Sequence, residues 1–334
     1  MTSSESWGFG HYYAQLANQQ HMLEDTTRTG AYQWAVTRNR EDFADKVVVD
    51  VGAGTGILSI LAAQAGARRV FAVEASPMAE HARSLIAANG FADTIEVIHG
   101  RIEEIDLPEP ADLLISEPMG VFLLHERMLE SFITARERWL HSEGKMFPGR
   151  ASLFVAPFSD SYLHSSTMTK ALFWEQPNFF GFDLTSLAAV ARQQHFSQPV
   201  VGPVAPAAIQ TEAVAHDLDF QSVRANDLQQ IRIDLDFTVT SSTVIHGLAG
   251  WFDVTFAGST ESVRLDTSPT SPRTHWYQTR FLFEQPIALQ EGASLDGSIT
   301  LTANERGSYD ISIVVGEMQQ VYELQRQRYW WHTS

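Results

Sequence analysis

The sequence predicts an α/β protein in which a Rossmann-like domain with a doubly wound parallel sheet precedes an antiparallel β-barrel domain. Over residues 46–148, short apolar runs alternate with helical stretches, and the first run ends in a glycine-rich turn. This alternation is typical of βα units. Over residues 149–334, strand patterns of period two recur at short intervals, as in a β-barrel or sandwich. A helical, aromatic-rich stretch at about residues 159–192 interrupts this second part near its start.

The composition suits a globular protein with packed cores. A chain of 334 residues with 44% apolar content is long enough for about two domains. Its 23 Lys and Arg against 40 Asp and Glu give a net charge of −17. Such a charge repels phosphate backbones and attracts basic surfaces, so we expect basic protein partners and no direct contact with nucleic acid. The absence of cysteine excludes disulfides, thiolate zinc sites and a cysteine nucleophile.

No targeting or membrane segment is expected. The first ten residues have neither a basic stretch nor an apolar run, so they do not resemble a secretory signal. Residues 47–67 are apolar but include Asp50 and four glycines, which favours a strand, a turn and a helix over a membrane span. We expect a soluble intracellular protein.

The N-terminal segment, residues 1–45, is predicted to be helical. Apolar residues are spaced by three and four over residues 7–40, with Gln, Glu and Arg between them. Gly30 interrupts this run. We therefore expect two short helices with a break at Gly30.

The Rossmann-like domain is expected over residues 46–148. Its strands are predicted in the segments VVVDV, VFAVEAS, TIEVIHG and ADLLISEP. Helices are predicted after the glycine turn, from Pro77 onward, and over residues 126–140. Because each strand is followed by a helix or a long connection, the strands are expected to run parallel.

The C-terminal domain, residues 149–334, has the pattern of half-buried strands. In the segment IRIDLDFTV, one face is apolar and the other is charged; the apolar face is formed by Ile231, Ile233, Leu235, Phe237 and Val239. The segments WFDVTF, HWYQTRFLF, SITLTA and YDISIVV repeat the alternation. An antiparallel barrel or sandwich follows from these repeats.

The glycine turn after the first strand is predicted to hold a nucleoside. Gly52, Gly54 and Gly56 precede a helix, where free backbone amides and the missing Cβ let a ligand approach. A dinucleotide fingerprint would place its third glycine where this chain has Ile57, which disfavours a pyrophosphate. Glu74, at the end of the second strand, could accept hydrogen bonds from both ribose hydroxyls of an adenosine. The alternative is a tight turn beside an ordinary carboxylate.

Two glutamates follow the fourth strand, at the rim where such sheets bind ligands. Glu117 and Glu126 are nine residues apart around a Pro-Met-Gly turn, so one loop could bring both carboxylates onto a single group. Two anions held together favour a cation between them. A guanidinium suits them, because its planar fork can pair with both carboxylates and leave one terminal nitrogen free. Singly, each glutamate could equally be a solvated or capping carboxylate.

With these residues the sequence resembles the type I protein arginine methyltransferases, most closely the coactivator-associated group. The resemblance covers nearly the whole chain. It rests on the segments RTGAYQWA from Arg28, VVVDVGAGTGILSILAAQAGA, VFAVEAS, SEPMG with ERMLES, MFP, THW at residues 274–276, and ANERGSYDI. It implies a Rossmann-like domain that binds S-adenosylmethionine, followed by the β-barrel domain.

The resemblance assigns roles to individual residues. Catalytic roles fall to Glu117, Glu126 and His275, and Asp25 would pair with His275. S-adenosylmethionine, which leaves as S-adenosylhomocysteine, would be bound without a metal by Tyr13, Gln19, Met22, Arg28, Gly52, Glu74, Glu103 and Ser131. Among these, Arg28 would hold the methionine carboxylate, Glu74 the ribose and Glu103 the border of the adenine. The substrate would contact Asp25, Met128 and Trp276.

The resemblance also implies a product, partners and an assembly. The expected reaction is methyl transfer to arginine in proteins such as histones or RNA-binding proteins, giving monomethyl- and asymmetric dimethylarginine in the nucleus and cytoplasm. Met22 and Met128 would shape the wall that favours the asymmetric product. The aromatic stretch at residues 159–192 would be a dimerisation arm of a head-to-tail homodimer.

One departure from the family concerns the N-terminal lid. The family has a Tyr-Phe pair followed by a further Tyr, whereas this chain has Phe9, Gly10 and Tyr13. Gly10 lacks the ring that would cover the cofactor, so we expect a looser lid or one rebuilt with Trp7 or Tyr12. Two other functions stay open: methyl transfer to a small molecule, which the glycine turn and Glu74 alone would allow, and a catalytically silent dimeric scaffold.

Overall fold

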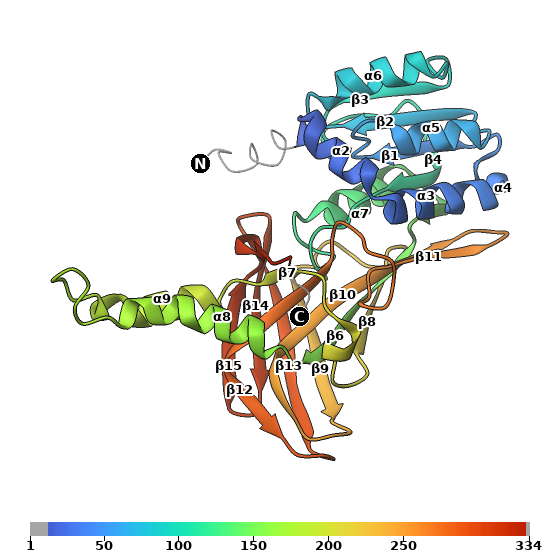
Figure 1. Ribbon diagram of the computed structural model, residues 1–334. Helices are drawn as coiled ribbons and strands as arrows, with labels where there is room; N and C mark the ends of the chain where they lie inside the picture. The colour runs from blue at the N-terminus through green and yellow to red at the C-terminus, as the bar shows by residue number, and fades with distance from the viewer. Residues whose placement is uncertain (1–12, 332–334) are drawn as a thin grey trace.

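The computed structural model describes residues 13–331 and divides them between a parallel-sheet part and an antiparallel part with a projecting helical arm (Figure 1). The α-helices are α2 (Leu16–Glu24), α3 (Thr26–Arg38), α4 (Arg40–Phe43), α5 (Ile57–Gln64), α6 (Met78–Ala88), α7 (Met128–Trp139), α8 (Ser161–Leu172) and α9 (Ala188–Phe196). Single turns of 3-10 helix are η1 (Phe173–Glu175), η2 (Thr185–Leu187), η3 (Pro206–Ala208) and η4 (Leu324–Arg326).

The strands of the parallel-sheet part are β1 (Val47–Val51), β2 (Arg69–Glu74), β3 (Ile95–His99), β4 (Ala111–Ser116) and β5 (Leu140–Phe147). The antiparallel part has β6 (Arg150–Phe158), β7 (Val200–Gly202), β8 (Val214–Asp219), β9 (Gln230–Thr238), β10 (Thr243–Ala257), β11 (Ser262–Asp266), β12 (Gln278–Leu289), β13 (Ser294–Asn304), β14 (Ser308–Val315), β15 (Met318–Glu323) and β16 (Arg328–Tyr329).

The first sheet is parallel and has the order β3-β2-β1-β4-β5. Its central strand β1 is buried along its whole length, as its continuous apolar run predicts. Right-handed crossovers place α5 and α6 on one face and α7 on the other. The strand order reverses between β1 and β4, so the carboxyl ends of these two strands form the edge where ligands bind in such sheets.

The N-terminal helices are present, but the predicted break at Gly30 is wrong. Helix α3 runs through Gly30, and the chain instead turns at Asp25, between α2 and α3. The Asp25 side chain accepts a hydrogen bond of 2.8 Å from the Arg28 backbone N–H and so caps α3. A cap satisfies a free amide, whereas one internal glycine costs only about 1 kcal/mol. The lid residues Trp7, Phe9, Gly10 and Tyr12 lie outside the described part of the chain.

Two other elements differ from the prediction. Helix α7 begins at Met128 instead of Glu126, because Glu126 and Arg127 have left-handed φ angles of +73° and +56°. Strand β5 was not predicted, because its sequence has no apolar run. It lies at the sheet edge, where most of its residues are at least partly exposed. The first of these differences directly follows the loop that carries the two glutamates.

The C-terminal strands confirm the predicted antiparallel domain and form two hydrogen-bonded sheets. One has the order β16-β7-β12-β10-β6-β8, with β11 paired to β10, and the other has the order β15-β14-β13-β9. In β9 the residues of the predicted apolar face are buried and those between them are exposed. The sheets share one core; for example, the ring of Phe281 on β12 lies 5.3 Å from that of Tyr322 on β15.

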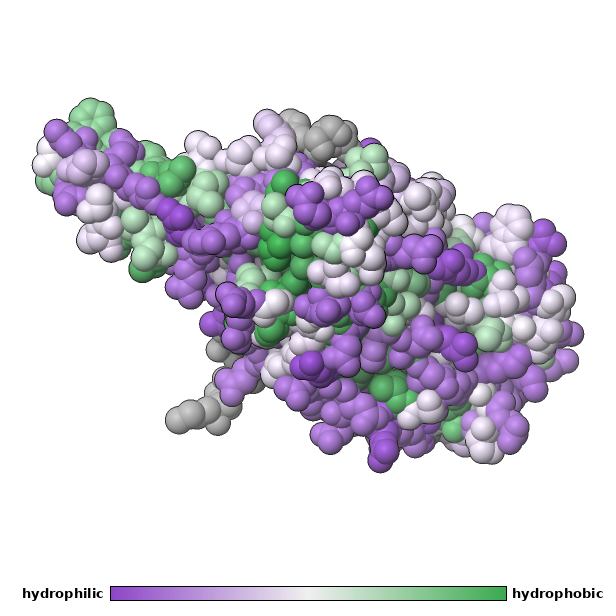
Figure 2. Space-filling model, turned by 90° about the horizontal axis from the view of Figure 1, so that it is seen from below, coloured by the Kyte–Doolittle hydropathy of each residue, from purple (hydrophilic) through white to green (hydrophobic). Residues whose placement is uncertain are grey.

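The helical arm projects away from the rest of the protein (Figure 1). Helices α8 and α9 form it, so its helical part extends to Phe196, slightly beyond the predicted residue 192. Apolar side chains are exposed along it, as Figure 2 shows; they include Tyr162, Leu172, Phe173, Phe180, Phe182, Leu187 and Val190. A cluster of this kind is typical of a surface that another chain covers.

The N-terminal helices also fasten the two parts together. The Asn39 side chain accepts hydrogen bonds from the backbone amides of Thr260 and Glu261 at 3.0 and 2.8 Å, in the turn between β10 and β11. The ring of Tyr32 on α3 packs 4.8 Å from that of Phe256 on β10. These contacts fix α3, and with it Arg28, over the switch point of the parallel sheet.

Candidate active site

The glycine turn forms a close-fitting edge at the carboxyl end of β1. Gly52 has a φ of +72°, and a Cβ placed there would lie 2.5 Å from Cε of Met128. The Gln19 side chain lies over Gly54 and donates a hydrogen bond of 2.9 Å to the Tyr13 carbonyl oxygen. The bare backbone that follows β1 therefore lies against the Gln19 side chain of helix α2 and the Met128 side chain at the start of α7.

Glu74 is held beside this turn by backbone amides. Its carboxylate accepts hydrogen bonds from the amides of Gly54 at 2.8 Å and Ser76 at 2.7 Å, and only 7% of the residue is exposed. A carboxylate can accept about four hydrogen bonds, so acceptor sites are left for a ligand. The geometry agrees with the predicted position of Glu74 at the end of the second strand.

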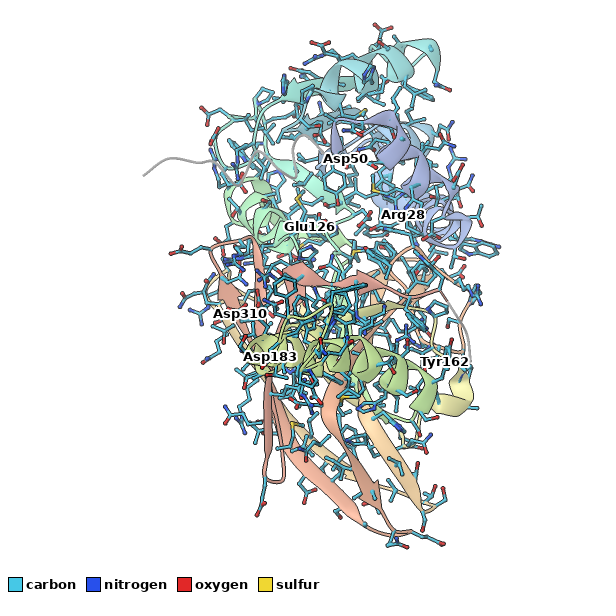
Figure 3. The ribbon with its side chains drawn as sticks, turned by 60° about the vertical axis from the view of Figure 1, so that its left-hand side comes forward. Arg28, Asp50, Glu126, Tyr162, Asp183 and Asp310 are labelled. Atoms are coloured by element: carbon cyan, nitrogen blue, oxygen red, sulfur yellow. The ribbon has the colours of Figure 1, made fainter. Side chains whose placement is uncertain are left out.

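Arg28 and Glu117 form a buried ion pair across the switch point. Nε and Nη2 of Arg28 donate to the same oxygen of Glu117, at 3.2 and 3.1 Å, and the side chains are 7% and 10% exposed. The cation predicted for the cofactor thus contacts one of the two predicted catalytic carboxylates. Figure 3 shows Arg28, Asp50 and Glu126 in the same region of the parallel-sheet part.

The loop between the two glutamates is anchored in the antiparallel domain. Phe122 is 2% exposed and its ring packs 5.4 Å from that of Phe281, while Nδ1 of His125 lies 2.8 Å from the Ser308 hydroxyl. At Gly120 a Cβ would come within 1.9 Å of the His125 carbonyl oxygen, so the loop can close only with glycine there. This anchoring explains how left-handed backbone at Glu126 is tolerated, since such strain needs support from its surroundings.

Glu126 receives a hydrogen bond from the N-terminal helical segment. The Tyr13 hydroxyl donates to Oε2 of Glu126 at 2.6 Å. Burial, opposed by the Tyr13 hydrogen bond and assisted by the charge of Glu117, raises the pKa of Glu126 to about 7. Two carboxyl groups on one buried loop, one of them titrating near neutrality, form a site that gains from binding a cation.

His275 and Asp25 form the second polar pair of the site, as the resemblance predicted. Oδ2 of Asp25 accepts hydrogen bonds from the His275 backbone amide at 2.7 Å and from Nδ1 at 2.8 Å. Although burial alone would raise it, the pKa of Asp25 is lowered by hydrogen bonds from the His275 side chain and from backbone amides. An ionised Asp25 keeps the proton of His275 on Nδ1, so Nε2 of the neutral ring carries a lone pair.

The remaining predicted residues differ in their positions. The Ser131 hydroxyl donates to Glu103 at 2.5 Å, so these two residues lie together as expected. Met22 is half buried on α2, one turn before Asp25. Trp276 is only 3% exposed and its indole N–H donates to the Met119 carbonyl oxygen at 2.8 Å, so its substrate contact stays a prediction. Trp276 belongs to the core and supports His275, whose ring lies 4.0 Å away.

Two residues near the site were not predicted. Tyr32 is fully buried and its hydroxyl donates to the Ser116 carbonyl oxygen at 2.8 Å, directly before Glu117. Asp50 is fully buried in β1, accepts a hydrogen bond of 2.6 Å from Ser59, and has its pKa raised by burial to about 7. The signal for Asp50 was a single carboxylate inside the apolar run VVVDV, while Tyr32 gave no signal beyond an aromatic residue in a helix.

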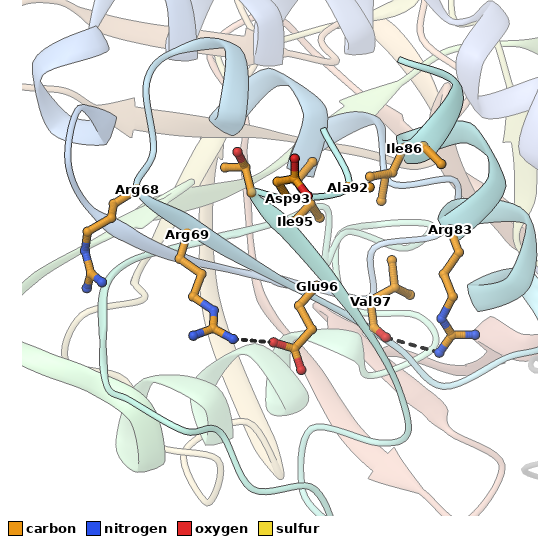
Figure 4. Close-up of a pocket in the computed structure, with 11 residues that line it drawn as sticks. Arg68, Arg69, Arg83, Ile86, Ala92, Asp93, Ile95, Glu96 and Val97 are labelled. Carbon is orange, nitrogen blue, oxygen red and sulfur yellow. Dashed lines mark hydrogen bonds and ion pairs between the residues drawn. The ribbon is translucent and has the colours of Figure 1, made fainter. Parts of the chain in front are cut away.

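A large hollow elsewhere carries no comparable chemistry. It has a volume of about 780 Å³ and lies along β3 at the outer edge of the parallel sheet (Figure 4). Its arginines are already engaged: Arg69 pairs with Glu96 at 2.6 Å, and Arg83 donates to the Val97 carbonyl oxygen at 3.1 Å. In residues 13–331, no three or more His, Asp or Glu side chains are grouped to hold a metal ion. No helix in this range is long and apolar enough to cross a bilayer.

The fold and the site define the class of protein. The parallel sheet carries a glycine turn with the buried carboxylate of Glu74 beside it and is joined to an antiparallel β domain, against which the loop with the two glutamates packs. Residues 48–144 match the family described as Methyltransferase domain, and residues 149–316 match the Arginine methyltransferase oligomerization subdomain. The chain belongs to the protein arginine methyltransferase family.

Similar proteins and structures come from plants, insects and a trypanosome. The chain is 52% identical over 306 residues to a probable histone-arginine methyltransferase CARM1 of Oryza sativa subsp. japonica, covering 91% of this chain and 58% of the relative. It is 48% identical over 302 residues to the histone-arginine methyltransferase CARMER of Drosophila grimshawi, covering 90% and 55%. The chain thus spans a little over half the length of these relatives.

Solved structures cover the chain more completely. The Trypanosoma brucei PRMT1 enzyme-prozyme heterotetrameric complex with AdoHcy superimposes with a TM-score of 0.85 and 34% identity, covering 93% of this chain and 99% of that one. Arabidopsis thaliana protein arginine methyltransferase 10, in an open conformation, also has a TM-score of 0.85, with 32% identity and coverage of 94% and 99%.

Proposed function

We propose that this protein transfers methyl groups from S-adenosylmethionine to guanidinium nitrogens of arginine in basic proteins such as histones, giving monomethyl- and asymmetric dimethylarginine. The observation that carries the proposal is the loop from Glu117 to Glu126, where one carboxylate already holds the guanidinium of Arg28 and the other is buried beside it. The similarity to histone-arginine methyltransferases supports the same substrate class.

The residues at the switch point fit S-adenosylmethionine. Gly52 presents bare backbone where a Cβ would collide with Met128, and Glu74 offers a buried carboxylate beside the turn. Arg28 is the cation available for the methionine carboxylate, and the Glu103–Ser131 pair would border the adenine. Gln19, Tyr13 and Met22 would complete the wall on the side of α2. S-adenosylmethionine supplies a methyl group activated by a positively charged sulfur.

The two glutamates have an electrostatic task in this proposal. A protonated guanidinium beside another unit positive charge at about 4 Å is repelled by about 4 kcal/mol at an effective dielectric of about 20. This energy corresponds to roughly three powers of ten in rate. Glu117 and Glu126 would offset it and hold the positive charge of the guanidinium on the side away from the reacting nitrogen. Fixing that nitrogen in line lowers the entropic part of the barrier.

His275 would take up the proton released on transfer. Its Nδ1 proton is directed to Asp25, so Nε2 is the basic nitrogen. Met128, which packs over Gly52, would shape the wall around the second methylation and favour the asymmetric product.

We further propose a division into residues 1–45, 46–148 and 149–334, with the arm mediating a homodimer closed head to tail. The exposed aromatic arm and the match to an oligomerization subdomain support this assembly. Histone substrates would place the protein in the nucleus, and RNA-binding substrates would also be met in the cytoplasm.

The test is mass spectrometry of an arginine-containing histone-tail peptide incubated with the protein and S-adenosylmethionine. Fragment ions that place two methyl groups on one nitrogen would support both the reaction and its type. Cofactor binding without any methylated peptide would contradict the proposal and favour methyl transfer to a small molecule or a silent scaffold.

A further inference from the structure

A second cavity adjoins the loop that carries His275. Its volume is about 290 Å³, close to the lower end of the range of ligand pockets, about 300–1,000 Å³. Pro203, Pro206 and Pro269 give it apolar walls, and Arg273, Thr274 and Tyr277 line it from the loop before β12. We call it the Arg273 pocket.

The loop before β12 contributes residues to both the candidate active site and the Arg273 pocket, and the two sets of residues differ. His275 is hydrogen-bonded to Asp25, and Trp276 is directed into the core toward Met119. Thr274 and Tyr277 line the pocket instead, and the left-handed φ of +52° at Tyr277 turns the chain between these directions. Because consecutive Cα atoms are about 3.8 Å apart, a ligand in the pocket touches backbone within two residues of His275.

The polar groups of the pocket are suited to an anion. Thr274 is 5% exposed, and its hydroxyl oxygen has no hydrogen-bond partner within the described residues. Arg273 is exposed and makes neither an ion pair nor a hydrogen bond with any residue in the described range. Among the described residues, no carboxylate lines the cavity. The nearby Asp266 is occupied by the hydroxyls of Ser268 and Ser271, at 3.2 and 2.8 Å.

We propose that the Arg273 pocket binds an acidic side chain of the substrate polypeptide, a few residues away from the methylated arginine. Arg273 holds the oxyanion, Thr274 donates a further hydrogen bond, and the prolines and Tyr277 pack against the adjoining backbone. The chain carries a net charge of −17, so an acidic residue is repelled by most of its surface and is favoured where a cation has no partner. This inference rests on the proposed function and adds a determinant of substrate sequence to it.

The pocket and His275 share one loop, so the acidic residue is expected close to the target arginine in the substrate sequence, and an extended peptide that rises about 3.3 Å per residue lets a positional scan locate it. An ion pair at a partly exposed site is worth up to about 1 kcal/mol, which corresponds to about a fivefold preference.

The test is a positional scan of peptides that contain one arginine with neutral flanks and a single Asp or Asn at each position. For the wild-type protein we expect kcat/KM to be about fivefold higher for Asp than for Asn at one position. Arg273→Gln should bring this ratio to one, and Arg273→Glu should reverse it. Arg150→Gln, which removes another exposed arginine that forms no ion pair with any residue in the range 13–331, is the matched control and should keep the ratio.

Binding of the same fluorescent peptides, measured by anisotropy, separates this inference from the proposed function. A preference for Asp that depends on Arg273, in the absence of methylation, would contradict the proposed reaction and support the pocket. A phosphoserine peptide at the best position that binds more tightly than Asp, again through Arg273, would assign a phosphate as the occupant. Equal binding of Asp and Asn peptides at every position, or a preference unchanged in Arg273→Gln, would overturn the inference.

Discussion

The Tyr13 hydroxyl donates a hydrogen bond of 2.6 Å to Oε2 of Glu126, which joins the N-terminal helical segment to the glutamate loop across 113 residues of sequence. Glu126 is partly buried, and its pKa is raised to about 7 by that burial and by the nearby Glu117. This hydrogen bond therefore couples the position of the N-terminal helical segment to the ionisation of Glu126.

Replacing Glu126 with Gln should abolish methyl transfer while the fold and cofactor binding persist. Gln keeps the shape but removes the charge that offsets the positive guanidinium, so we expect a loss of about a thousandfold in kcat. Methylation of a histone-tail peptide and calorimetric titration with S-adenosylhomocysteine measure the two properties. Glu96→Gln, at the outer edge of the sheet, is the control and should leave both unchanged. An active Glu126→Gln variant would refute the electrostatic role.

The pH dependence of kcat/KM should report the titration of Glu126. Because the ionised form is needed and the pKa is raised to about 7, kcat/KM should fall by about tenfold per pH unit below that value. The Tyr13 hydrogen bond favours the ionised form, so Tyr13→Phe should move the midpoint to higher pH. A midpoint that stays in place or moves to lower pH in this variant would argue against the assignment.

The same pKa predicts a pH-dependent gain in stability for Glu126→Gln. The pKa of Glu126 is about 7 in the folded chain against an ordinary value of 4.5, so folding favours the neutral form. In the wild type, the contribution of Glu126 to the free energy of unfolding is therefore fully present below about pH 4.5. It is lost as the pH rises to about 7. Relative to the wild type, the variant should gain about 3 kcal/mol at pH 8 and little at pH 4.5. Denaturant unfolding at the two pH values checks this, and a gain confined to low pH would contradict it.

Breaking the Asp25–His275 pair should slow the reaction and also loosen helix α3. Asp25→Asn removes the charge that keeps the proton of His275 on Nδ1, and we expect about a hundredfold loss in kcat. The capping of α3 at the Arg28 amide changes too, at a cost of about 1 kcal/mol. Steady-state kinetics and thermal unfolding measure the two effects. Glu24→Gln, on the neighbouring exposed position, should behave like the wild type.

The arm should be required for assembly. Phe180 and Phe182 are 87% and 71% exposed, and burial of such a side chain against a second copy is worth about 1.5–3 kcal/mol. The double substitution Phe180→Asp and Phe182→Asp should therefore convert the proposed dimer to a 37.3 kDa monomer in light scattering. Val321→Asp replaces an exposed apolar residue on β15 and should stay dimeric. A dimeric double variant would exclude the arm as the contact.

Local patterns in the sequence were sufficient to determine the parallel-sheet fold and to indicate several candidate residues of the site. The strand VVVDV, the turn with Gly52 and the position of Glu74 are encoded by short-range periodicity and by residues that tolerate a left-handed turn. The alternating face of β9 is equally local. Glu117 and Glu126 were identified because they follow a strand end and lie only nine residues apart.

Tertiary structure alone decided how those residues are charged, held and shielded. The Arg28–Glu117 ion pair, the Tyr13–Glu126 hydrogen bond and the burial of Trp276 join segments far apart in the chain. The left-handed backbone at Glu126 depends on Phe122 and His125 being packed into the other domain. Periodicity in a single sequence predicts which face of a helix or strand is buried, but not which other element covers that face. Burial by a distant element determines both the backbone strain and the pKa of Glu126.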